Sequence, residues 1–154
     1  MAPVSTAAIP LEVTNTRIMI DQPSDHDDPM KWDAVHTYTR KQALEDGIQV
    51  AVPRETSREA GILFPVFLTR TVWDKYVEVP PGAKCQDEAG RLWDILWMMA
   101  CGIRSQREAD TIRFQLYVRN DNHRPKRVTL KARVDAADID DPQPAITVLL
   151  PDED

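Results

Sequence analysis

Residues 87–118 read DEAGRLWDILWMMACGIRSQREADTIRFQLYV, and the spacing of the apolar residues changes within this stretch. Between Asp87 and Ile103 they recur at the three- and four-residue steps of one helix face. From Ile112 onward they alternate with polar residues, as along a half-buried strand. The stretch therefore predicts a helix over about residues 87–103, followed by a strand over 112–118.

Alternation of apolar and polar residues continues beyond the turn at 120–125 and predicts two more strands, over 128–134 and 146–150. Their short connections favour a three-stranded antiparallel meander with one apolar face. We therefore expect an α+β fold in which this C-terminal meander packs against the long helix. Trp93 and Trp97 widen the apolar stripe to more than half of that helix, which predicts a central helix with the tryptophans in the core, Trp93 being the nearer of the two to the surface. The alternative is that the two rings anchor a partner protein.

Short helices and strands are expected before the long helix. Thr39 and Gln42 form a capping box for a helix that Gly47 ends. A strand over 48–52 and a one-turn helix over 56–61 follow. Pro65 makes the apolar run 62–68 an extended edge segment rather than a central strand, and Thr69 caps a helix over about 70–76.

The 154 residues suffice for one domain with its own core. Residues 1–33 are rich in turn residues and acids and have no sustained period, so we expect a flexible acidic leader at 1–33 and a single domain at 34–154. No signal peptide or membrane span is visible. The two cysteines, Cys85 and Cys101, are expected to be thiols in a reducing compartment, which indicates a cytoplasmic protein.

Acidic residues gather near the C-terminus, and the formal net charge of the chain is −6. We predict a partner-binding surface made of this acidic segment and one exposed aromatic residue: Asp135, Asp138, Asp140, Asp141 and Tyr117. The same aspartates could instead solubilise a loop or bind calcium or magnesium, although the segment lacks the glycine and closing glutamate of an EF-hand.

Basic residues gather on the polar face of the first predicted hairpin. The alternative site is a nucleic-acid surface on that face, made of Arg113, Tyr117, Arg119, Arg127, Lys131 and Arg133. Two other interpretations remain open: the face is simply solvated, or an acidic segment of the same chain covers it. The acidic net charge argues against a general nucleic-acid binder.

No catalytic residue, metal site or cofactor is predicted, because the chain has no phosphate loop, dinucleotide fingerprint, nucleophile elbow or zincin motif. The acidic run 25–28 contains His26 but no second histidine nearby. Cys85, paired with His36 or His123, would make a small cysteine hydrolase; this is the weakest of the hypotheses.

Three segments, 38–47, 86–97 and 146–154, resemble a family of small proteins of unknown function carried on bacterial plasmids and phages. They read YTRKQALEDG, QDEAGRLWDILW and ITVLLPDED. The resemblance implies a bacterial cytosol and a mobile genetic element, and it implies no catalytic residues. Anti-CRISPR and other anti-defence proteins are one class of small acidic proteins from such elements, and they bind host proteins. We therefore expect a non-enzymatic protein-binding module that modulates or inhibits a host protein complex, such as a defence effector, as an anti-CRISPR or anti-defence protein does.

Overall fold

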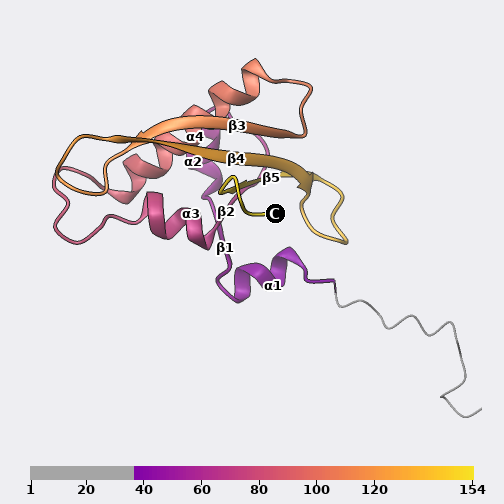
Figure 1. Ribbon diagram of the computed structural model, residues 1–154. Helices are drawn as coiled ribbons and strands as arrows, with labels where there is room; N and C mark the ends of the chain where they lie inside the picture. Colours follow the sequence, from indigo (N-terminus) through magenta and orange to yellow (C-terminus); the bar gives the residue numbers. More distant parts are fainter. Residues whose placement is uncertain (1–36) are drawn as a thin grey trace, which may run out of the picture. The chain divides into compact units, whose positions relative to one another are not determined.

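Five strands form one mixed sheet in the order β1-β2-β5-β4-β3 (Figure 1). The computed structural model describes residues 37–154, of which Tyr38–Asp154 form one compact unit. The strands are β1 (Gln49–Ala51), β2 (Val66–Thr69), β3 (Thr111–Val118), β4 (Lys126–Ala136) and β5 (Pro144–Leu149). The predicted leader at 1–33 lies outside the described residues, as do residues 34–36.

The α+β class is confirmed, but the prediction of a three-stranded antiparallel sheet is wrong, because the sheet has five strands and is mixed. β3, β4 and β5 do form the predicted antiparallel meander. β2 then joins β5 in parallel, and β1 joins β2 in antiparallel orientation. The expectation of an edge segment at 62–68 is wrong, because β2 lies between β1 and β5. The strand begins just after Pro65, whose carbonyl oxygen accepts a hydrogen bond from Ile146 N. Proline at that place removes no N–H from the strand itself.

Two of the short helices begin at the capping residues that the sequence predicts. Thr39 and Gln42 form the capping box of α1 (Arg40–Glu45), and Gly47 follows it with a φ of 71°. The helix α2 (Arg54–Glu59) begins and ends two residues before the predicted 56–61, since it follows Pro53, whose side chain makes no capping hydrogen bond. Thr69 caps α3 (Arg70–Val72), which continues into the π-helical turn η1 (Trp73–Val77). Asp87 accepts a hydrogen bond from Gly90 N and so begins the long helix α4 (Glu88–Ser105).

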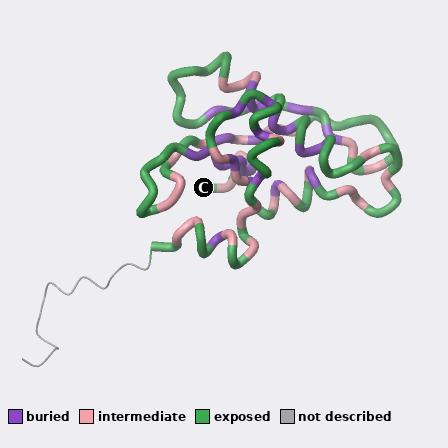
Figure 2. Tube along the Cα trace, turned by 180° about the vertical axis from the view of Figure 1, so that it is seen from behind, coloured by how far each residue is buried: buried purple, intermediate pink, exposed green. Residues whose placement is uncertain are grey.

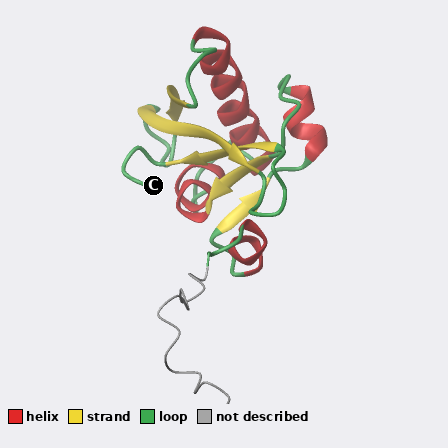
Figure 3. Ribbon diagram, turned by 90° about the vertical axis from the view of Figure 1, so that its right-hand side faces the viewer, coloured by secondary structure: helices red, strands yellow, loops and turns green. Residues whose placement is uncertain are grey.

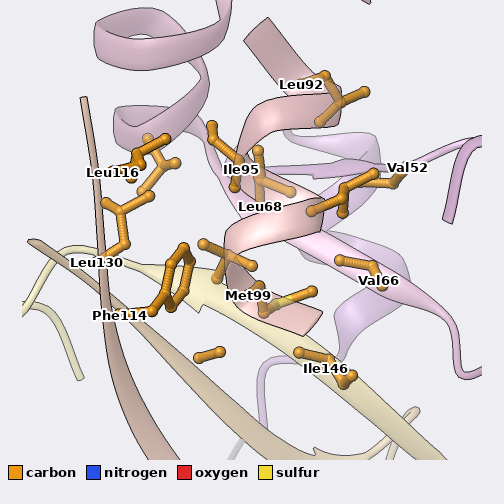
Figure 4. Close-up of a cluster of buried hydrophobic side chains, with 14 of the residues drawn as sticks. Val52, Val66, Leu68, Leu92, Ile95, Met99, Phe114, Leu116, Leu130 and Ile146 are labelled. Carbon is orange, nitrogen blue, oxygen red and sulfur yellow. The ribbon is translucent and has the colours of Figure 1, made fainter. Parts of the chain in front are cut away.

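The core lies between α4 and one face of the sheet (Figure 3). Leu92, Ile95 and Met99 of α4 lie among side chains of the strands, including Phe114 and Leu130 (Figure 4). A Cβ atom at Gly102 would stand 3.2 Å from both Ile112 Cδ1 and Phe114 Cβ. Glycine at this position therefore lets α4 approach β3 closely.

The central strand β5 is buried on both faces of the sheet. Ile146 and Val148 face α4, whereas Ala145, Thr147 and Leu149 are buried on the opposite, outer face. Buried residues accordingly gather in the middle of the sheet and along α4, while exposed ones dominate the connections (Figure 2). Part of the outer face is thus covered by other segments of the chain, and this coverage decides which predicted site residues remain open.

Candidate functional site

The strand register gathers the predicted basic residues on the outer face of the β3–β4 hairpin. Arg113 lies opposite Lys131, and Tyr117 lies opposite Arg127. Arg133 pairs with Thr111 on the same face. Five of the six residues proposed for nucleic-acid binding therefore share one surface, and the sixth, Arg119, follows the end of β3.

Half of this set is already engaged within the chain. Lys131 Nζ donates to the carbonyl oxygen of Glu153 and lies 3.8 Å from the Asp154 carboxylate. Arg133 Nε donates to Asp135 at 3.1 Å. Arg119 Nη2 donates to Lys84 O at 2.7 Å. Within residues 37–154, Arg113 and Arg127 have side chains with no hydrogen bond or ion pair, and Tyr117 is 68% exposed.

Two of the four aspartates predicted to bind a partner instead hold α1 against the sheet. Arg40 Nη2 donates to Asp135 at 2.8 Å. The Asp138 carboxylate accepts hydrogen bonds from the backbone N–H groups of Arg40 and Lys41. Asp140 and Asp141 are exposed. The acidic segment is therefore paired internally in part, but chiefly with Arg40 rather than with the basic hairpin.

Arg40 is the centre of this contact. Its guanidinium makes five hydrogen bonds, to Ala137 O, Gln49, Thr147, Asp135 and Ala136 O. It also lies over the Phe67 ring, 4.4 Å from the ring centroid. The hollow beside it, of about 290 Å³, is lined in part by Arg40, Gln49, Asp135 and Ala136 of this network and by Tyr38, Asp138 and Ile139. With its polar groups already paired, this hollow has a structural role.

Asp138 links the stability of this region to pH. Backbone N–H groups, that of Ile139 above all, hold the pKa of Asp138 below its usual value. A carboxyl whose pKa is lowered by folding stabilises the fold above its unfolded pKa, and this contribution disappears as the pH falls through the folded pKa. We expect Asp138→Asn to lower the urea midpoint at about pH 6 and to have a smaller effect at about pH 2, below the carboxyl range. Asp140→Asn is the control and should change little at either pH. An equal effect of Asp138→Asn at both pH values would contradict this assignment.

A second hollow lies on the other side of the hairpin, between α4 and β3. This α4–β3 groove has a volume of about 470 Å³. It is lined by Asp94, Trp97, Met98, Gln115, Leu116, Tyr117 and Arg127. The helix supplies the first three, and the consecutive run Gln115–Tyr117 comes from β3. The groove therefore follows an outer strand of the sheet.

Tryptophans form a ridge beside the α4–β3 groove. Trp93 and Trp97 are 37% and 41% exposed, so the expectation that the tryptophans belong to the core is wrong, and Trp93 is not the more exposed of the two. Their rings stack with centroids 5.2 Å apart and an interplanar angle of 11°. Arg104 lies over Trp97, 5.7 Å from the ring centroid. This column keeps the Trp97 ring in place at the groove wall while leaving much of it open.

Asp94 is the acid of the groove. Within residues 37–154 its carboxylate has no hydrogen bond or ion pair, and desolvation raises its pKa above the usual value. Asp94 also lines two smaller hollows that continue the groove along α4 towards Gln86 and Trp93. An unpaired carboxylate beside aromatic rings is a favourable place for a cationic side chain.

Within the part of the chain that the structure describes, Cys85 and His123 are the only members of the predicted cysteine–histidine pairs, and no hydrogen bond joins them. Cys85 is exposed and has a φ of 57°, and both cysteines are free. Asn122 bonds to Lys84 and Gly82 instead. His36 and the run 25–28 lie outside the described residues. Within 37–154 no group of acidic, histidine or cysteine side chains is arranged to hold a metal ion. No helix of that part is both long and apolar enough to cross a membrane.

Comparison with known proteins gives a family and no activity. Residues 30–154 match the family described as "Family of unknown function (DUF6573)". The chain belongs to this family. No curated protein and no solved structure matches the chain. The match covers all of the fold described above, so the α4–β3 groove lies within the family's own region.

Of the residues that line the α4–β3 groove, the sequence predicts Tyr117 as a partner contact and Arg127 for the nucleic-acid alternative, and it does not predict Asp94 or Met98. One signal was present: the apolar stripe of α4 is wider than a single core face needs. The excess residues, Trp93, Trp97 and Met98, are the ones that remain exposed.

Proposed function

We propose that this domain is a non-enzymatic protein-binding module whose docking site is the α4–β3 groove. One observation carries the proposal: Trp97, Met98 and Tyr117 line a single open groove on the surface of the domain. Tryptophan, tyrosine, methionine and arginine are the residues enriched in protein interfaces, and exposed aromatic clusters of this kind contribute most of the binding energy.

We propose further that the partner is a host protein complex of a bacterial cell, such as a defence effector, and that the chain comes from a mobile genetic element. This part rests on the resemblance to small plasmid and phage proteins. Asp140 and Asp141 supply a second, acidic contact in this proposal. Asp135 and Asp138 support it indirectly, because they hold α1 in place.

Copurification from a bacterial host that carries defence systems tests the proposal. The tagged protein should retain a stoichiometric protein partner at high salt. Trp97→Ala should weaken that complex by about ten- to a hundred-fold, since truncating a central aromatic residue costs about 2 kcal/mol or more. Leu63→Ala is the matched control: Leu63 is 74% exposed, lies outside the groove and should leave the affinity unchanged.

Two outcomes would contradict this function. If the partner binds Trp97→Ala as tightly as the unaltered protein, the groove is not the docking site. If only nucleic acid is recovered, at low salt, and Arg127→Glu abolishes its binding, the hairpin face is a nucleic-acid site. The surface open to nucleic acid is smaller than the six predicted residues would give, because Lys131, Arg133 and Arg119 are engaged within the chain.

A further inference from the structure

The edge of β3 has an alternating pattern of used and unused backbone groups. Asp110 O accepts a hydrogen bond from Val134 N at 2.8 Å, which fixes the phase of the β3–β4 ladder. Even-numbered residues of β3 therefore bond to β4, and odd-numbered ones direct their N–H and C=O groups away from it. In the described part of the chain no strand lies on that outer side.

Side chains of the α4 region cover this edge at two places. Gln106 Nε2 donates to Arg113 O at 3.3 Å, and Arg91 Nη1 donates to Arg119 O at 2.9 Å. Both acceptors are odd-numbered, in agreement with the phase of the ladder. Between them, the outward N–H and C=O groups of Gln115 and Tyr117 have no partner within residues 37–154. We call this stretch, Gln115–Tyr117, the β3 window.

The β3 window coincides with the α4–β3 groove. Gln115, Leu116 and Tyr117 form the strand side of the groove, and Asp94, Trp97 and Met98 form its helix side. Unpaired main-chain groups beside a side-chain pocket are what an added strand needs, because the main chain supplies affinity and the pocket supplies specificity.

We infer that the partner docks as an extended segment that adds a strand to β3 at the window and places a basic side chain against Asp94. This inference rests on the proposed protein-binding function. Side chains of an added strand alternate between the two faces of the sheet. Those on the helix side meet Asp94, Trp97 and Met98, while their neighbours meet Tyr117 and Arg127. The preferred segment therefore has a basic or apolar residue on the helix side and an acidic residue next to it.

A second copy of this chain fits the window poorly. If β3 of another molecule paired with the window, its helix-side residues would be Ile112, Phe114, Leu116 and Val118, which α4 already buries. None of these residues carries a cation for Asp94. The charge of the groove therefore favours a segment of a different protein.

Selection of random linear peptides displayed on phage against the full-length protein provides the probe. We expect enriched peptides with a lysine or arginine next to an acidic residue. In a synthetic copy of the best peptide, N-methylation of alternate residues should lower affinity at least about ten-fold, because each methyl group blocks one main-chain hydrogen bond to β3. Methylation of the intervening residues should have little effect.

Charge exchange tests the contact with Asp94. Asp94→Lys should weaken the peptide at least about ten-fold, and replacing the basic residue of the peptide by glutamate should restore binding. Glu108→Lys makes the same charge change outside the groove and should leave the affinity unchanged.

Each other outcome overturns the inference in a distinguishable way. Peptides whose binding needs Trp97 but tolerates every N-methylation would support the groove as the docking site and contradict the addition of a strand to β3. Peptides whose binding is insensitive both to Trp97→Ala and to N-methylation would also contradict the groove as the docking site. Concentration-dependent self-association that Trp97→Ala abolishes would make a second copy the occupant, and failure to enrich any Asp94-dependent peptide would overturn the inference itself.

Discussion

Replacement of Arg40 by alanine is expected to lower the free energy of unfolding by about 3 kcal/mol. This is the lower end of the effects found when one partner of a buried ion pair is removed. The Arg40 side chain is 11% exposed and makes five hydrogen bonds. Its loss would leave the carbonyl groups of Ala136 and Ala137 without their donor and Asp135 without its closest cation. The packing against Phe67 would be lost as well.

Urea unfolding monitored by tryptophan fluorescence measures this effect. Arg40→Lys keeps the charge but not the planar fork of donors, so it should recover only a minor part of the loss. Arg70→Ala is the matched control, because Arg70 forms an exposed ion pair with Asp74 in the next turn. Such pairs contribute less than about 0.5 kcal/mol. If Arg40→Ala costs no more than Arg70→Ala, Arg40 does not hold α1 to the sheet.

Arg91→Met is expected to lower the free energy of unfolding by about 2 kcal/mol. The Arg91 guanidinium is buried, and this desolvation lowers its pKa. It donates to Tyr76 O, Gln86, Arg119 O and Asn120, and no carboxylate within 37–154 forms an ion pair with it. Methionine keeps much of the volume but leaves two main-chain carbonyls without a donor, and each buried unpaired group costs about 1–3 kcal/mol. The two side-chain acceptors can turn to water, which limits the loss.

Calorimetry of Arg91→Met beside Arg58→Met, an exposed arginine on α2, separates this effect from a change of charge. The control should stay within about 0.5 kcal/mol of the unaltered protein. Equal stability of both variants would mean that Arg91 is not needed to join η1, α4 and the β3–β4 turn.

Local patterns in the sequence predicted the elements, whereas the complete sheet depends on contacts far apart in the chain. The capping residues Thr39 and Thr69 begin helices as expected, and the change of period near residue 105 separates α4 from β3. The parallel pair of β2 and β5 joins residues about eighty positions apart. The local sequence of neither strand shows which strand it pairs with. Pro65 alone therefore led to the prediction of an edge segment.

Only some features of the candidate site followed from the sequence, because others depend on contacts that the fold alone brings together. Segregation of charge indicated internal pairing, but it could not identify Arg40 as the partner of Asp135 and Asp138, because α1 reaches them only through the fold. The position of Tyr117 and Arg127 on the polar face of a hairpin followed from alternation. Trp97 was assigned to the core because periodicity gives the width of an apolar stripe and not which part of it the sheet covers.

Residue-resolved amide exchange of the free protein and of its complex with a selected peptide tests the central claim most directly. In the free protein the Gln115 and Tyr117 amides should exchange quickly, while those of Phe114 and Leu116, which bond to β4, should be protected. Adding the peptide should protect Gln115 and Tyr117 as well. If these two amides are already protected in the free monomer, or stay unprotected in a saturated complex, the partner does not add a strand at the β3 window.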